Sequence, residues 1–129
     1  MHKSRLAGFI IDCDTEDLDA AADFWAKALG APATKKADLS KSPYVELKMP
    51  ADEPYMEVQK IDHPSRIHLD IESDDIDAEV SRLEKLGATR IEAIKSWVVM
   101  EAPTGQRFCV VPVVSANFAA RAHTWNEDE

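Results

Sequence analysis

The chain has 129 residues, 45% of them hydrophobic, so it is long enough to fold as one domain around a core of its own. Fifteen basic residues against 24 acidic ones give a net charge of −9, which opposes general binding to nucleic acid or to anionic lipid surfaces. Both cysteines, Cys13 and Cys109, lie in apolar runs, so no disulfide framework is expected. Because no apolar run is long enough to span a membrane and the start MHKSRLAG lacks a signal-peptide core, we expect a cytoplasmic protein.

The first half of the chain is predicted to hold a strand, a helix and three short strands. The stretch Arg5–Cys13 predicts the first strand. From Asp17 to Gly30 the spacing predicts a helix with an apolar stripe of Leu18, Ala21, Ala22, Trp25 and Leu29. Prolines then separate three strand-like segments, Thr34–Ala37, Tyr44–Met49 and Tyr55–Ile61.

The second half begins with its clearest strand, in which apolar Ile67, Leu69 and Ile71 alternate with Arg66, His68 and Asp70. A helix should follow, capped by Ser73 or Asp74 and ended by Gly87. Its apolar face is expected to cover the three apolar strand residues and to leave His68 and Asp70 on the open face; this helix face comprises Ile76, Val80, Leu83 and Leu86. Three more strands are predicted at Thr89–Ala93, Ser96–Glu101 and Arg107–Val111, with a turn at Pro103–Gly105.

The two halves share an order of elements, strand, helix and three strands. Ile11-Asp12 corresponds to Leu69-Asp70, and Leu29-Gly30-Ala31 corresponds to Leu86-Gly87-Ala88. Two copies are too few for a solenoid, so we expect them to pair about a pseudo-twofold axis. The sequence therefore predicts one domain, residues 1–129, with a first module at 5–61, a second at 66–112 and a tail at 113–129.

The tail allows two interpretations. Phe118, Ala122 and Trp125 would share one stripe of a helix, which either docks on a partner or over the cleft, or simply covers a sheet edge. The last four residues, NEDE, are predicted to be disordered.

Three stretches resemble a known superfamily. DLDAAADFWAKALGA resembles the first helix of the glyoxalase, bleomycin-resistance and extradiol-dioxygenase proteins, the vicinal oxygen chelate superfamily. HLDIESDDIDAEVSRLEKLGATR is similar to the strand and helix of that superfamily's second half, and APTGQRFCVV is similar to its closing turn and strand. The nearest likeness is to the glyoxalase-like subgroup. The resemblance implies an α+β fold in which two βαβββ modules lie side by side and form a curved, cleft-shaped sheet.

The resemblance also implies a divalent metal in that cleft, held in active members by four side chains, commonly His, Glu, His and Glu. His68 falls on the third of these positions, and it is either a metal ligand or a half-buried histidine bonded to a neighbour such as Asp70. For the second position Met56 and Val58 should face the core, which leaves Glu57 and Gln59 on the open face. Glu57 is either a ligand or a solvated strand residue.

The other two positions depart from the family pattern. Ile10 or Gly8 stands at the first position, and neither binds a metal. Asp12 could supply a carboxylate from the same face, although capping or ion pairing is its more ordinary role. The fourth position is Cys109, whose thiolate would favour a softer metal than a carboxylate site does. A standard four-ligand centre is therefore not expected, and the cofactor is either none or a divalent metal on His68 and Glu57.

Three hypotheses describe the function. The first is a glyoxalase-like protein that binds a small organic molecule in its cleft without the standard metal site, through Asp12, Tyr44, Glu57, His68, Asp70 and Trp97. The second is a metal-dependent lyase, isomerase or dioxygenase. The third is a structural or regulatory module whose cleft is filled by its own side chains. A homodimer is expected because such sheets leave edges and small members of the family commonly pair.

Overall fold

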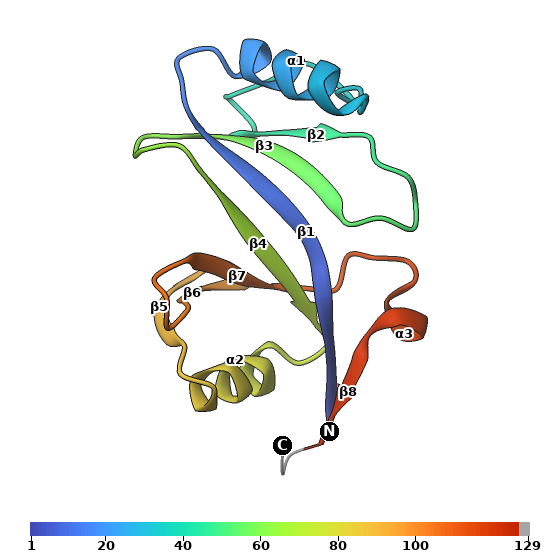
Figure 1. The fold of residues 1–129 in the computed structure, drawn as a ribbon, viewed down its shortest axis with the longest axis vertical. Helices are drawn as coiled ribbons and strands as arrows, with labels where there is room; N and C mark the ends of the chain where they lie inside the picture. Colours follow the sequence, from blue (N-terminus) through green and yellow to red (C-terminus); the bar gives the residue numbers. More distant parts are fainter. Residues whose placement is uncertain (127–129) are drawn as a thin grey trace. The chain divides into compact units, whose positions relative to one another are not determined.

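The computed structural model describes residues 1–126 and shows an α+β fold, as the sequence predicts. Eight strands and three helices follow in chain order (Figure 1): β1 His2–Asp14, α1 Leu18–Leu29, β2 Tyr44–Leu47, β3 Tyr55–Ile61, β4 Arg66–Ser73, α2 Ile76–Lys85, β5 Thr89–Ile94, β6 Trp97–Glu101, β7 Arg107–Pro112, α3 Phe118–Arg121 and β8 His123–Trp125. Paired strands follow the order β2-β3-β1-β4-β7-β6-β5, and β8 pairs with β1. None of the helices in this part of the chain is long and apolar enough to cross a membrane.

The chain forms two compact units. One comprises residues 8–68 and is called the 8–68 unit below. The other holds both chain ends, Met1–Ala7 together with Leu69–Glu129, and is called the terminal unit. β1 and β4 run through both units, because the boundary crosses each of these strands.

In the 8–68 unit α1 covers one face of the three strands β1, β3 and β2. Asp17 caps the helix by accepting from the Ala20 N–H at 3.0 Å, and Gly30 ends it in the left-handed conformation at φ 68°. The core between helix and strands comprises Ile11, Leu18, Ala22, Ala31, Val45, Leu47 and Val58. Met56 and Val58 belong to this side of β3, as the alternation predicts. Leu29, expected in the buried stripe, is instead 49% exposed.

In the terminal unit α2 packs over β7 and β6. Its core comprises Val80, Leu83, Val98, Met100 and Val110. The cap is Asp75, whose side chain accepts from the Ala78 N–H, and not Ser73 or Asp74. Ser73 and Asp74 have other partners, since the Ser73 hydroxyl donates to the Lys3 carbonyl and the Asp74 carboxylate accepts from the Lys3 N–H.

Two predictions about strands are corrected by the structure. Thr34–Ala37 is not a strand, and only a single bridge, between Ala33 and Leu47, joins this region to β2. The apolar side of β4 is covered only in part: Ile71 packs against the α2 core, whereas Ile67 and Leu69 are 59% and 41% exposed. α2 packs over β5, β6 and β7, and of the three apolar residues of β4 only Ile71 joins its core.

The tail is not one helix. α3 has four residues, Ala122 is extended, and β8 then pairs antiparallel with the start of β1, with Trp125 opposite His2. The tail thus covers a strand edge, which was one of the two interpretations. It does so by pairing the backbone of β8 with β1 and not by packing a helix. Residues 127–129 of the predicted disordered end lie outside the described part of the chain.

Candidate functional site

The face of the 8–68 unit that α1 does not cover carries most of the predicted site residues. Because Ile11, Val45 and Val58 point into the core, their strand neighbours point to the opposite side. We call this side the polar face; it comprises Gly8, Ile10, Asp12, Tyr44, Glu46, Tyr55, Glu57, Gln59 and His68.

Strand register arranges the polar face in three rows. Asp12 of β1 lies beside Gln59 of β3, and Gln59 lies beside Tyr44 of β2. Ile10, Glu57 and Glu46 form the second row. In the third, Gly8 lies beside Tyr55. Three carboxylates therefore share one sheet face.

Asp12 and His68 form the best-defined polar contact of this face. Asp12 Oδ2 lies 2.6 Å from His68 Nδ1, and the side chains are 2% and 11% exposed. A carboxylate only accepts hydrogen bonds, so Nδ1 carries the hydrogen and Asp12 fixes the orientation of the imidazole. Sequence analysis proposed both residues for the site but not their contact.

The second oxygen of Asp12, Oδ1, is buried and has no hydrogen-bond partner among the described residues. Arg66 Nε lies 3.6 Å from Oδ2, beyond hydrogen-bond reach, and its side chain is 47% exposed, so this ion pair contributes little. An unsatisfied buried polar group costs about 1–3 kcal/mol. Such a cost beside a short carboxylate–imidazole contact is what a site awaiting a hydrogen-bond donor would show.

Cys13, next to Asp12 in β1, does not belong to the site. Its side chain packs against the α1 core. Burial, and then the negative charge of Asp12, raise the pKa of the Cys13 thiol, so it stays protonated and unreactive.

The remaining predicted residues, Asp70 and Trp97, belong to the terminal unit. Asp70 is buried and lies beside Cys109 of β7, which lies beside Val99 of β6. Val98 points into the α2 core, so Trp97 points to the face without the helix. The sequence alone left this choice open.

The donors do not fit the four-ligand metal centre that the resemblance implies. At the first position Ile10 is apolar and 2% exposed, and it lies beside Glu57. At the fourth, Cys109 offers sulfur where hard divalent ions prefer oxygen. His68 uses Nδ1 for Asp12. That pairing leaves Nε2 as the one ring nitrogen of His68 that could ligate a metal.

Glu72 is a buried acid that sequence analysis missed. It is 0% exposed, and its Oε1 accepts from the backbone N–H groups of Val114 and Ser115 at 2.8 and 3.0 Å. Among the described residues Oε2 has no hydrogen-bond partner, and it lies 3.7 Å from Nε of Arg5, whose side chain is only 14% exposed. Because both partners are enclosed, we interpret Glu72 as an anchor for the chain after β7.

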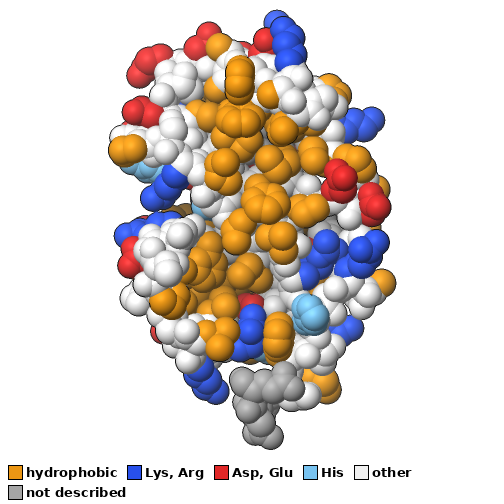
Figure 2. Space-filling model, viewed as in Figure 1, with side chains coloured by type: hydrophobic (Ala, Val, Ile, Leu, Met, Phe, Trp, Pro, Cys, Tyr) orange, Lys and Arg blue, Asp and Glu red, His pale blue; other side chains and the backbone are white. Residues whose placement is uncertain are grey.

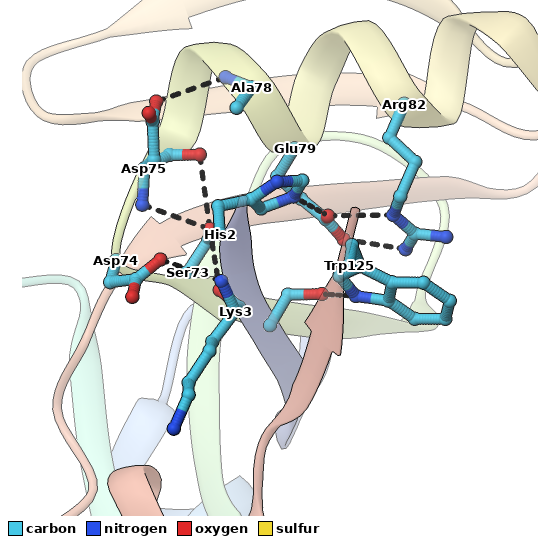
Figure 3. Close-up of polar contacts among 10 residues, drawn as sticks. His2, Lys3, Ser73, Asp74, Asp75, Ala78, Glu79, Arg82 and Trp125 are labelled. Atoms are coloured by element: carbon cyan, nitrogen blue, oxygen red, sulfur yellow. Dashed lines mark hydrogen bonds and ion pairs between the residues drawn. The ribbon is translucent and has the colours of Figure 1, made fainter. Parts of the chain in front are cut away.

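A second missed network joins both chain ends to α2 (Figure 3). Glu79 accepts from His2 Nε2 and from Arg82 Nε and Nη2, each at 2.8 Å. Arg82 also lies over the Trp125 ring at 3.8 Å, and Trp125 Nε1 donates to the Ser4 hydroxyl. Burial by itself raises the pKa of Glu79, but the hydrogen bonds from Arg82 and His2 outweigh burial and lower it. With every oxygen of Glu79 paired, this network is structural.

Comparison with known proteins identifies the family. Residues 9–111 match the model of the glyoxalase-like domain, whereas no curated protein matches. Among solved structures, a hypothetical protein of Bacillus halodurans is similar with a TM-score of 0.64 at 12% identity, covering 86% of this chain and 95% of that one.

Two epimerase structures share the fold as well. Methylmalonyl-CoA epimerase in complex with methylmalonyl-CoA and NH4+ has a TM-score of 0.59 at 14% identity, covering 88% of this chain and 98% of that one. A Streptomyces coelicolor methylmalonyl-CoA epimerase has a TM-score of 0.55 at 13% identity, and the match covers 87% of this chain and 97% of that one. These identities show a shared fold alone. Since the family model spans most of the sequence, the chain belongs to the glyoxalase-like domain family of the vicinal oxygen chelate superfamily.

Proposed function

We propose that this protein binds a small organic molecule on the polar face, with Asp12 as the anchor and without the four-ligand metal site of the family. One observation carries the proposal, namely that the buried Asp12 Oδ1 has no hydrogen-bond partner within residues 1–126 while Oδ2 orients His68. Because Oδ1 is itself buried, a ligand reaches it only when the side chains over it move aside, and a hydrogen bond donated there would then remove the cost of its burial.

The charges of the polar face indicate which ligands it favours. Asp12, Glu57 and Glu46 bring acidic groups to the face, and Arg66 is the basic side chain beside Asp12. The whole chain carries a net charge of −9. We therefore expect an organic cation with an N–H donor to bind better than an anion of the same skeleton. Asp70 and Trp97, which belong to the terminal unit, stay predictions from the sequence.

The test compares three ligands of one skeleton, n-pentylamine, 1-pentanol and pentanoate, by titration into ¹⁵N-labelled protein. We expect the amine to bind, with amide shifts in β1 and β3, and pentanoate not to bind. Asp12→Asn should weaken the amine at least about tenfold, because hydrogen bonds to charged groups contribute about 1.5–3 kcal/mol. Asp14→Asn is the matched control, since Asp14 is an exposed acid two residues further along β1.

The alternatives are separate outcomes of this experiment. Equal amine affinity in wild type and Asp12→Asn would refute Asp12 as the anchor. If none of the three compounds binds, the structural module is favoured. Protein purified without chelator can also be analysed for metal. Near-stoichiometric metal that is lost in His68→Ala would refute the claim that the site lacks a metal. It would favour a lyase, isomerase or dioxygenase whose metal is held by His68 and Glu57.

A homodimer also stays a proposal. Large apolar side chains reach the surface, among them Phe24 at 62%, Ile67 at 59% and Leu86 at 66% exposed. Figure 2 shows hydrophobic side chains at the surface of the face drawn, between acidic and basic ones. Exposed apolar area of this kind supports self-association, which sedimentation equilibrium would test by a mass of one or two chains.

A further inference from the structure

Tyr55 occupies the place where Gly8 would carry a side chain. The two residues lie side by side in the parallel strands β1 and β3. A Cβ built on Gly8 would lie 2.3 Å from Tyr55 Cδ1, 2.5 Å from Cε1 and 2.6 Å from Cγ. No alanine could occupy position 8 with the ring where it is. Tyr55 therefore leans across β1, and the absence of a side chain at Gly8 makes this possible.

The three distances also give the orientation of the ring. A point beyond the edge of a ring is much farther from the two neighbouring atoms than from the nearest atom. The Cβ position is almost equally close to Cδ1 and to both of its bonded neighbours, so it lies over a face of the ring. Because Cβ atoms stand out from the plane of a sheet, the ring lies roughly flat on the strands. Its opposite face points away from the sheet, and the residue is only partly buried.

The flat ring lies on the same face as the anchor. Met56 and Val58 point into the α1 core, which puts Tyr55, Glu57 and Gln59 on the polar face. Along β1 Asp12 lies four positions beyond Gly8, about 13 Å of extended chain. One ligand could reach both places only if a spacer separates its cation from its planar group and displaces the cover of Ile10, which lies between them and is 2% exposed.

We propose that Tyr55 is a stacking platform of the binding site, held flat by Gly8, and that the site favours organic cations whose planar group is joined to the cation by an extended spacer. This inference rests on the proposed function, because it takes Asp12 as the anchor of the cation. Aromatic stacking adds about 0.5–1.5 kcal/mol beyond the area buried, and it requires a flat partner.

The experiment uses ω-phenylalkylamines from benzylamine to 8-phenyloctylamine and their ω-cyclohexyl counterparts. The readout is the ratio of the cyclohexyl to the phenyl dissociation constant at each chain length, measured by NMR titration. In the wild type we expect a ratio near one for benzylamine and about fivefold preference for phenyl at the longer spacers. Nuclear Overhauser effects should connect the phenyl protons of the long ligands with the Tyr55 ring.

Three variants separate the ring from its surroundings. Tyr55→Phe keeps the ring and should keep the preference. Tyr55→Leu keeps an apolar side chain without a flat face, and the ratio should fall to about one at every length. Gly8→Ala displaces the ring and should have the same effect as Tyr55→Leu. Should Gly8→Ala fail to fold, the Tyr55→Phe and Tyr55→Leu pair decides alone.

The outcomes distinguish this inference from the proposed function. A phenyl preference that survives in Tyr55→Leu, or one that is as large for benzylamine as for the long amines, would overturn the platform. Amine binding that depends on Asp12 but shows no phenyl preference would overturn the platform and leave the proposed function intact. If no amine binds, both are refuted.

Discussion

Glu79 in the terminal unit and Asp12 in the 8–68 unit are both acidic residues removed from water, at 0% and 2% exposure. Glu79 has both oxygens paired, with three hydrogen bonds from His2 and Arg82. Asp12 has one oxygen paired with His68 and one with no hydrogen-bond partner. Burial is thus compensated in the first residue and only half compensated in the second.

The difference separates structural from ligand-binding acids within one small fold, and Glu72 falls on the structural side because its second oxygen lies beside the enclosed Arg5. A fully paired buried acid ties elements together, and in this chain Glu79 joins α2 to the start of β1 and, through Arg82, to β8. A half-paired acid lowers stability unless something else donates to it. Removing the charge should therefore lower the free energy of unfolding strongly at Glu79 and hardly at all at Asp12.

Glu79→Ala should give the largest effect, a loss of about 3–5 kcal/mol in the free energy of unfolding, because it leaves the Arg82 charge without its partner in a largely buried place. Urea unfolding followed by tryptophan fluorescence and circular dichroism measures it. Glu84→Ala is the control, since Glu84 is an exposed acid of the same helix and should change stability by less than about 0.5 kcal/mol. A loss at position 79 no larger than at position 84 would contradict the network.

Lowering the pH should reproduce part of the stability loss expected for Glu79→Ala. The pKa of Glu79 lies below its ordinary value of 4.5, so its ionised form stabilises the fold above that pH, and the contribution disappears as the pH falls through the folded-state pKa. The free energy of unfolding of the wild type should exceed that of Glu79→Gln by a constant margin above about pH 5.5. This margin should shrink as the pH falls towards about pH 3. A margin that grows on acidification would mean that the pKa is raised. Parallel urea titrations of both proteins across this range make the measurement.

Local features of this fold are predictable from the sequence. The start of α1 at Asp17, the glycine at its end and the alternation of Met56 and Val58 with Glu57 and Gln59 depend on neighbouring residues, and the structure confirms each. The cap of α2 was misplaced because three adjacent residues, Ser73, Asp74 and Asp75, are all suitable, and contacts with Lys3 decide between them.

Long-range contacts are the part that was not predictable. Asp12 and His68 are 56 positions apart, and Glu79 and His2 are 77 apart, so no spacing rule connects them. β8 replaced a predicted helix for the same reason, since the free edge of β1 that pairs with it comes from the other end of the chain. The Tyr55 ring was missed as well, although a glycine within an apolar strand is a recognised sign that something approaches the backbone closely.

Asp12→Asn should give the smallest change in stability and the most informative one. Asparagine keeps the size of the side chain and can still contact His68 Nδ1, while it removes a charge that is buried with one oxygen unpaired. We expect the free energy of unfolding to stay within about 1 kcal/mol of wild type, or to rise, in the same variant that loses amine binding. Stability gained together with binding lost is typical of a residue retained for a ligand, because the fold alone has no use for its charge. A loss as large as that of Glu79→Ala would instead show that Asp12 is a structural acid, and it would remove the difference between the two units on which the proposed function depends.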